Sequence, residues 1–432
     1  MRNGAPNGAE HEPMGNLHVG RASAARHTWW RPFPRVFTAV FTLIAIALFV
    51  VEHINGRFWL NDFRVYYGAG AALLNNDPLY GVAHGLDSGV FKYAPMLALV
   101  YALFALLPYS LAASIQFGLI TLAFIDGVRR IDRLVRTTFL NGKPEAYLPL
   151  FLIALACIVH LHRELHLGNI NMMLLWLLVV ALEQLMRAKD LRGGALLGAA
   201  ILAKPHFVVL LPLLVLRGRW KALLAASGAL AAGLLLPALF LGWPANMEVH
   251  VAWLGEMAKH NAALIYTGGD DHRAVNTIYS FVHRAALKHF LSPSGTEAYG
   301  LLALIAGAFA LFVRRNQRRG VANAFPFEYL LLVGLVPSIT LTDTEHFLLA
   351  LPLVAYTIHR LVPRAHPRWL APIAVPLLVL YGGNFEDAWG PYADVLIHYG
   401  VLGVGSFGLL LVSTILWSRS NPAPFAVSNR GE

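Results

Sequence analysis

The sequence predicts an all-α, polytopic membrane protein. Of its 432 residues, 57% are hydrophobic and 13% are charged, and the mean hydropathy is +0.56. A soluble core does not need this much apolar surface. The apolar residues also fall into about twelve segments that alternate with short polar stretches. We therefore expect about twelve transmembrane helices, with an additional amphipathic surface helix in the first outer loop.

The apolar segments set the order of the expected spans. They cover residues 36–52, 94–127, 147–161, 169–186, 191–203, 205–217, 221–241, 299–313, 325–341, 346–362, 370–382 and 398–417. Several are shorter than the roughly 20 residues of an ideal span, so we expect tilted helices or a thinned bilayer. The run 94–127 is too long for one span and is interrupted at Pro108. Segments 191–203 and 205–217 form either two spans or one kinked span that buries Lys204.

Three regions follow from this pattern. Residues 1–35 are expected to form a disordered cytoplasmic tail, because their first part is rich in Gly, Asn and Pro. Residues 36–417 form the transmembrane domain, and residues 418–432 form a second cytoplasmic tail. The first apolar run follows several arginines, and we interpret it as an uncleaved signal anchor.

Basic residues gather in every second gap between the apolar segments. The clusters are Arg21–Arg35, Arg129–Lys143, Arg187–Arg192, Arg217–Lys221, Arg314–Arg319, Arg360–Arg368 and Arg419. By the positive-inside rule, these clusters and both termini face the cytoplasm. The alternate gaps, including loops 53–93 and 242–298, face outward. The net charge of +10 is therefore explained by membrane topology rather than by nucleic-acid binding.

The first outer loop places an isolated acid among aromatic residues. Asp62 begins a stretch, residues 62–75, that is predicted to be a helix on the membrane surface. One face of this helix carries Phe63, Tyr66, Tyr67, Gly70 and Leu74. An acid at this place faces water and lipid headgroups together, where a reaction between a lipid-borne group and a polar acceptor would need a base.

Short motifs in the outward-facing stretches carry a resemblance to a known family. They are an Asp-Phe and a Tyr after the first span, Phe-Lys-Tyr-x-Pro, Gly-x-x-Asn, a Lys-Pro break, and a late turn before a His. The matching residues are Asp62, Phe63, Tyr66, Tyr67, Phe91, Lys92, Tyr93, Pro95, Gly168, Asn169, Asn171, Lys204, Pro205, Asn276, Arg284, Ser338 and His346. In order and spacing, this set resembles glycosyltransferase family 87, the polyprenyl-phosphate-mannose-dependent mannosyltransferases of the GT-C fold. The chain departs from the family pattern at Ala94, His166–Leu167 and Thr340–Glu345.

The resemblance implies an inverting, membrane-embedded glycosyltransferase of the cell inner (plasma) membrane. Its active site would lie on the outer, periplasmic face. The donor would be a polyprenyl-phosphate-linked sugar, with mannose favoured, and the acceptor a glycan or glycolipid. The resemblance implies neither a cofactor nor a metal.

The expected chemistry assigns roles to the polar residues. Departure of a phosphate needs cations rather than a strong acid, and the attacking hydroxyl needs one carboxylate as base. Asp62 is the expected base, and its alternative is a helix-capping role. The expected phosphate-binding residues are Lys92, His346, Arg64 and Lys204. Lys92 could instead be a snorkelling lysine, His346 an interfacial histidine, and Lys204 a structural charge. The expected donor- or acceptor-binding residues are Tyr66, Tyr93, Asn169, Asn171, Asn276 and Arg284.

Two clusters invite a metal interpretation. In the first, His160, His162, Glu164 and His166, a helix would place only His162 and His166 on one face, so we favour an interfacial polar turn. The second, Asp270–His272, follows a Gly-Gly pair and is more typical of a solvated loop tip. The single cysteine, Cys157, excludes disulfides and cysteine-based metal sites.

A transporter or flippase of a lipid-linked sugar is the alternative function. Such a protein should show repeated halves with paired broken helices and acids at the bilayer midplane. The Asp-Phe-x-x-Tyr-Tyr stretch has no second copy, and the span interiors hold almost no acids. An acyl- or phosphotransferase would need a histidine or metal cluster that the sequence lacks. The pattern therefore favours the glycosyltransferase.

Overall fold

The computed structural model describes residues 35–86, 89–262, 276–282, 295–340, 343–363, 366–383 and 389–421. These residues form helices and connecting turns, and within them the only β-type pairing is an isolated bridge between Ala83 and Val90. The prediction of an all-α protein is confirmed for the described part of the chain.

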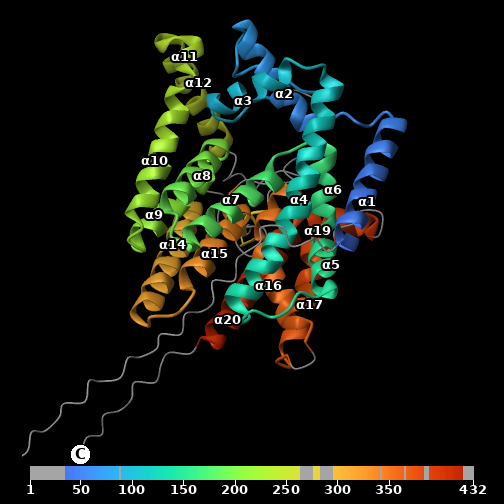
Figure 1. The fold of residues 1–432 in the computed structure, drawn as a ribbon, viewed down its shortest axis with the longest axis vertical. Coiled ribbons are helices and arrows are strands. Elements are labelled where there is room, and N and C mark those ends of the chain that lie inside the picture. Colours follow the sequence, from blue (N-terminus) through green and yellow to red (C-terminus); the bar gives the residue numbers. More distant parts are fainter. Residues whose placement is uncertain are drawn as a thin grey trace, which may run out of the picture.

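The helices follow the predicted segments in order (Figure 1). They are α1 (Arg35–Ile54), α2 (Asn61–Asn75), α3 (Pro95–Ala105), α4 (Tyr109–Phe139), α5 (Tyr147–Ala156), α6 (Ile158–Leu167), α7 (Asn171–Met186), α8 (Asp190–Ala203), the 3-10 helix η1 (Pro205–Val209), α9 (Leu210–Leu216), α10 (Trp220–Leu235), α11 (Ala238–Leu241), α12 (Trp243–Ala262), α13 (Ile278–Val282), α14 (Gly295–Arg318), α15 (Ala324–Ile339), the 3-10 helix η4 (Thr344–Ala350), α16 (Leu351–Leu361), α17 (Leu370–Gly382), α19 (Pro391–His398) and α20 (Val401–Ser420).

The lengths of these helices divide them into two groups. In the described chain, five helical stretches are long and apolar enough to cross a bilayer, namely 35–54, 109–139, 220–241, 298–318 and 401–420. The pair α5 and α6 passes the same test together but is bent by 55°. Helices α3, α7, α15 and α17 and the η1–α9 pair are shorter and apolar. The structure thus shows a protein with several membrane-spanning helices, and the number twelve stays a prediction.

Proline and glycine residues explain where several helices begin and how closely they pack. The long run 94–127 is broken before Pro108, and α4 starts directly after it, as expected. Helices α8 and α10 lie side by side (Figure 1). A Cβ atom on Gly194 would lie 2.1 Å from the backbone oxygen of Ala222. This small-residue contact brings the two helices together by van der Waals packing.

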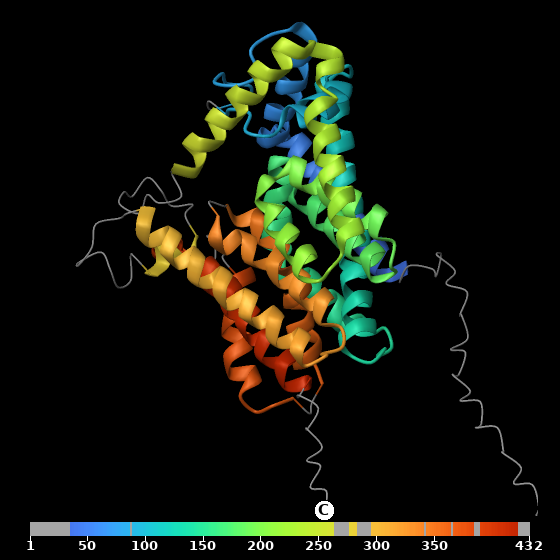
Figure 2. The same cartoon turned by 90° about the vertical axis from the view of Figure 1, so that its left-hand side faces the viewer.

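The polar segments of interest lie at one end of the molecule. In Figures 1 and 2, α2, α3 and the turn between α10 and α12 lie at the upper end. The connections from α14 to α15 and from α16 to α17 lie at the lower end. The described basic residues of two clusters, Arg314, Arg315, Arg318, Arg319, Arg360 and Arg368, lie in or beside these lower connections. The orientation of the protein in the membrane stays a prediction.

Candidate active site

The start of α2 places Asp62 inside the protein. Leu60 adopts a left-handed conformation with φ of 44°, and the helix begins at Asn61 without a side-chain cap. Asp62 lies in the first turn, where the helix dipole favours a negative charge. Because the cap position belongs to Leu60, the described geometry does not use Asp62 as a cap residue.

Helix α2 is buried under other helices to a greater extent than a helix on the membrane surface would be. The side chains of Phe63 and Tyr66 are buried, and only Leu74 of the predicted lipid-facing residues is strongly exposed, at 47%. A Cβ atom on Gly70 would lie 2.5 Å from the backbone carbon of Tyr101 in α3. The absence of a side chain at Gly70 therefore lets the two backbones meet, and α3 covers much of the face that we expected at the lipid interface.

The turn between α6 and α7 brings an amide to Asp62. Gly168 ends α6 with φ of +69°, and a Cβ atom there would lie 2.7 Å from Cβ of Phe63. Gln116 donates a hydrogen bond to the Gly168 carbonyl oxygen at 3.0 Å. Only glycine combines this left-handed backbone with such close contact. The next residue, Asn169, consequently reaches the first turn of α2.

Asn169 joins several polar groups from distant parts of the chain. Its Nδ2 atom donates to Oδ2 of Asp62 at 2.6 Å and to Oε1 of Glu345 at 3.5 Å. Its Oδ1 atom accepts hydrogen bonds from the hydroxyl of Tyr66 at 3.2 Å and from the backbone N–H of Ile170 at 2.7 Å. The hydroxyl groups of Tyr66 and Tyr93 lie 2.9 Å apart. Asn169 therefore anchors the carboxylate and one aromatic wall of the site.

A second group of polar residues surrounds Lys204. Its Nζ atom lies 2.6 Å from Oδ1 of Asn171 and 2.7 Å from Nε2 of His346. Because an ammonium can only donate, His346 Nε2 is the acceptor of this bond. The Nδ2 atom of Asn171 donates to Glu164, which also accepts from the backbone N–H of Met172. Lys204 is 6% exposed, so this is a buried polar cluster.

The 3-10 helix η4 connects the two groups. Glu345 Oε1 lies 3.4 Å from Nδ1 of His346, and Glu345 Oε2 lies 3.1 Å from Nε of Arg163. The side chain of Asp343 accepts a hydrogen bond from the backbone N–H of His346 and so caps η4. His160 Nδ1 lies 2.8 Å from the carbonyl oxygen of Thr344. These bonds dock η4 on α6 and place Glu345 and His346 between Asn169 and Lys204.

The surroundings of Asp62 change its proton affinity. Burial and the negative charge of Glu345 raise the pKa of the Asp62 carboxyl to about 7. The positive charge of Lys204 and the hydrogen bond from Asn169 act in the opposite direction. A carboxylate with a pKa near neutrality is well matched to general-base catalysis.

The family model described as glycosyltransferase family 87 matches residues 91–352 of the chain. The chain belongs to glycosyltransferase family 87. No curated protein matches the sequence. As a family 87 member of the GT-C type, the protein is a membrane glycosyltransferase that takes a sugar donor and an acceptor. The matched range contains Asn169, Lys204, Glu345 and His346, whereas Asp62 precedes it.

The structure brings together most of the predicted site residues of this family 87 protein. Seven of them lie in one connected network: Asp62, Tyr66, Tyr93, Asn169, Asn171, Lys204 and His346. These residues come from loops and helix ends between positions 62 and 346, as expected for a site made by tertiary folding. Their chemical roles stay predictions.

Two predicted residues, Arg64 and Lys92, make their described contacts away from this network. Arg64 stacks on the ring of Tyr109 at 4.4 Å, because residues two apart on a helix face different ways. Lys92 is exposed, and its backbone oxygen accepts a hydrogen bond from Trp253. Asn276 is buried, and its backbone contacts Gly403 of α20. Arg284 lies outside the described residues.

Three acids near the site have no predicted role in binding or catalysis. Glu164 is expected in a polar turn, and Asp343 and Glu345 belong to the stretch that departs from the family pattern. In the structure, Glu164 and Glu345 are buried at 0% and 1% exposure. Their positions just before Gly-Asn-x-Asn and just before His346 were the available signal, since an acid between two apolar segments is costly to bury without partners.

The metal interpretation finds no geometric basis in the described part of the chain. No group of three or more His, Cys, Asp or Glu side chains lies there in a position to hold a metal ion. In the first cluster, the rings of His162 and His166 stack at 6.3 Å, while His160 and Glu164 are bonded elsewhere. The second cluster, Asp270–His272, lies outside the described residues.

Proposed function

We propose that this family 87 protein transfers mannose from a polyprenyl-phosphate donor to a glycan or glycolipid acceptor. The reaction takes place on the outer face of the inner (plasma) membrane and inverts the anomeric centre. The donor, the acceptor, the sugar and the orientation are all parts of this proposal.

The proposal rests on the buried ammonium group of Lys204 and the side chains around it. The ammonium is bonded to Asn171 and His346, and among the described residues no carboxylate lies within 4.0 Å of Nζ. The carboxylates of Glu164, Glu345 and Asp62 act on its charge from a greater distance. A buried ammonium is costly unless a counter-charge is nearby. A phosphate group supplies that charge and accepts several hydrogen bonds at once. We therefore assign the donor phosphate to Lys204 and His346.

Asp62 then serves as the base. The acceptor hydroxyl oxygen forms a bond to the anomeric carbon while the bond between that carbon and the phosphate oxygen breaks. The hydroxyl proton passes to the Asp62 carboxylate, and the electron pair leaves with the polyprenyl phosphate. Asn169 holds one carboxylate oxygen of Asp62 at 2.6 Å, which leaves the other for the proton.

The remaining predicted residues complete the proposed site. Tyr66 and Tyr93 form an edge-to-face aromatic pair with ring centroids 5.1 Å apart. Tyr93 is partly exposed and suited to contact a sugar ring, and the buried Tyr66 supports it. Lys92 is proposed as an outer cation at the entrance, because its side chain is exposed next to Tyr93. Asn171 orients Lys204 rather than the sugar. Arg64, which stacks on Tyr109, has no assigned role in donor binding.

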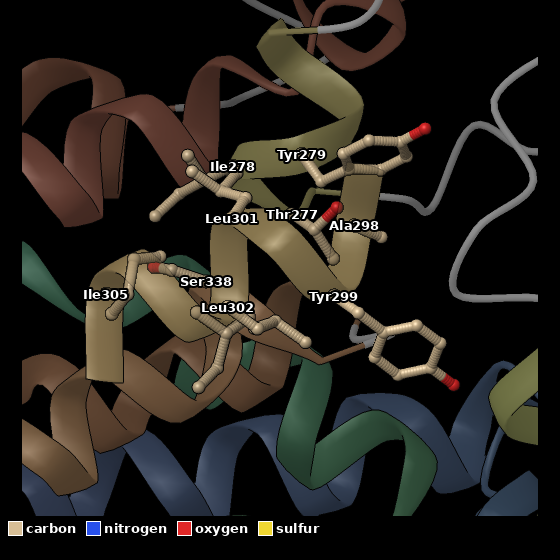
Figure 3. Close-up of a pocket in the computed structure, with 10 residues that line it drawn as sticks. Thr277, Ile278, Tyr279, Ala298, Tyr299, Leu301, Leu302, Ile305 and Ser338 are labelled. Carbon is tan, nitrogen blue, oxygen red and sulfur yellow. The ribbon is translucent and has the colours of Figure 1, made fainter. Parts of the chain in front are cut away.

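An apolar cavity at the end of α15 suits the lipid part of the donor. It is lined by residues of α13, α14 and the end of α15, as Figure 3 shows for Ile278, Leu301, Leu302 and Ser338. The volume of the cavity, including its open side, is about 440 Å³. Because α15 ends at Ile339, shortly before Asp343 and η4, an isoprenoid chain in this cavity would start near the phosphate-binding residues.

The test uses the purified full-length protein in lipid nanodiscs with radiolabelled polyprenyl-phosphate mannose and an extract of membrane glycolipids and glycans. Matched assays contain polyprenyl-phosphate glucose or a mannose nucleotide instead. We expect transfer from the polyprenyl-phosphate mannose and none from the nucleotide. Transfer from the nucleotide sugar alone would reject the proposed donor, and faster transfer of glucose would reject mannose as the sugar.

A further inference from the structure

Glu345 is a second buried carboxylate beside Asp62, and the proposed reaction does not yet use it. Its side chain is 1% exposed. Nδ2 of Asn169 lies 3.5 Å from Glu345 Oε1 and 2.6 Å from Asp62 Oδ2. The two carboxylates thus share one amide as hydrogen-bond donor, although Glu345 and Asn169 are 176 positions apart.

The orientation of this shared amide is fixed by its other atom. Oδ1 of Asn169 accepts from the hydroxyl of Tyr66 and from the backbone N–H of Ile170. If the amide were turned over, its oxygen would face two carboxylates and its NH₂ group would face two donors. Asn169 therefore directs its amide N–H groups toward the two acids and links Glu345 to Asp62.

We propose that Glu345 is a positioning residue for sugar transfer, which holds Asp62 through Asn169 and whose negative charge favours proton uptake by Asp62. This inference rests on the proposed role of Asp62 as the base. Glu345 would not touch the substrate, so it acts only through its neighbours.

The charges around Asp62 agree with this role. Burial is the largest cause of the raised pKa of Asp62. The negative charges of Glu345, in η4, and of Asp343, just before η4, raise this pKa further, whereas the positive charge of Lys204 lowers it. Arg163, on α6, forms an ion pair with Glu345 and so offsets part of its charge. The other titratable side chains of the network are Tyr66, Tyr93, Glu164 and His346. Glu345 is thus the strongest charged neighbour that favours protonation of Asp62.

Two substitutions should move the pH dependence of transfer in opposite directions. Glu345→Gln removes the negative charge while keeping the side-chain shape, so the acid limb of kcat/KM should move to lower pH by at least about half a unit. Arg163→Gln removes the positive charge that offsets the Glu345 carboxylate, so the pKa of Asp62 should rise. The acid limb of kcat/KM should therefore move to higher pH. The KM for the donor should stay unchanged in Arg163→Gln, because Arg163 is bonded to Glu345 and not to Lys204 or His346. Glu345→Gln also changes the contact with Nδ1 of His346, so its test is the pH of the acid limb and not the donor KM. Arg163 is 50% exposed at its side chain, so its substitution is expected to fold even if Glu345→Gln does not.

A second measurement follows the protonation of Asp62 without any substrate. Infrared difference titration of the purified protein would identify the Asp62 carboxyl band by its loss in Asp62→Asn. We expect a midpoint near 7 in the unmodified protein, a lower midpoint in Glu345→Gln and a higher one in Arg163→Gln. If the proposed function is wrong but the role of Glu345 is right, sugar transfer will be absent while the two variants still shift the Asp62 midpoint as expected.

A matched control is Glu328→Gln. Glu328 is also buried and bonded to an arginine, Arg217, but it contacts none of the residues of the site. Its substitution should leave the Asp62 midpoint and the acid limb in place. Unchanged midpoints in both Glu345→Gln and Arg163→Gln, or an equal shift in Glu328→Gln, would overturn the role of Glu345.

Discussion

The ammonium nitrogen of Lys204 lies 2.7 Å from Nε2 of His346, although 142 positions separate the two residues. Lys204 follows the last residue of α8, at a Lys-Pro break, and His346 lies in the first turn of η4. Helix α8 ends and helix η4 begins at this point. Their polar residues therefore meet where the apolar packing of the helices is interrupted. The pair therefore places a buried ammonium beside an imidazole where two segments distant in sequence meet.

Lys204→Met should weaken donor binding without unfolding the protein. Methionine fills a similar volume, and no ion pair within 4.0 Å is broken among the described residues, so we expect the fold to be kept. We expect binding of polyprenyl phosphate to weaken at least about tenfold, measured as the shift of the thermal unfolding temperature with added lipid. Lys189→Met, at the exposed opposite end of α8, serves as control and should bind normally. Normal lipid binding by Lys204→Met would refute the phosphate assignment.

Asp62→Asn should keep the fold and lose sugar transfer by on the order of a hundredfold or more. Asparagine keeps the shape of the side chain but cannot accept the hydroxyl proton. Donor binding should be largely retained, so the loss should appear in kcat rather than in KM. Transfer at nearly the rate of the unmodified enzyme would show that Asp62 has only a structural role.

The stability of the protein without substrate should fall as pH rises through 7. The pKa of Asp62 is raised from 3.8 to about 7 in the folded state, so the folded protein binds this proton more tightly than the unfolded chain does. The resulting stabilisation is complete below pH 3.8 and is lost as pH rises through about 7. It amounts to on the order of 4 kcal/mol. Thermal unfolding at pH 5 and pH 8 should therefore differ more in the unmodified protein than in Asp62→Asn, and equal differences would contradict the raised pKa.

Gly168→Ala should reduce both stability and activity. The added Cβ would lie 2.7 Å from Cβ of Phe63 and would disfavour the left-handed backbone, so Asn169 should move away from Asp62. Gly142→Ala is a matched control, because Gly142 has nearly the same φ, +73°, but open space around the new Cβ. We expect Gly142→Ala to cost about 1 kcal/mol with normal activity, and Gly168→Ala to lower kcat at least about tenfold. Equal effects of the two substitutions would argue against the positioning role of the turn.

Several features of this protein could be predicted from local sequence alone. The apolar segments predicted the helices in order, and Pro108 predicted the break before α4, because helix formation and membrane burial depend on the residues within one segment. Asp62, Lys204 and His346 could be selected for the same reason, since a polar residue between apolar runs stands out without knowledge of its partners.

Tertiary structure decided which of these polar residues meet and which side of α2 the protein covers. Asn169 reaches both Asp62 and Glu345, which are 107 and 176 positions away, and no local pattern encodes such a contact. Arg64, only two residues from Asp62, lies against Tyr109 instead. The reason is geometric: hydropathy records how each segment partitions into the membrane, whereas rotation of each helix and the close approach at Gly70 and Gly168 set the contacts between segments.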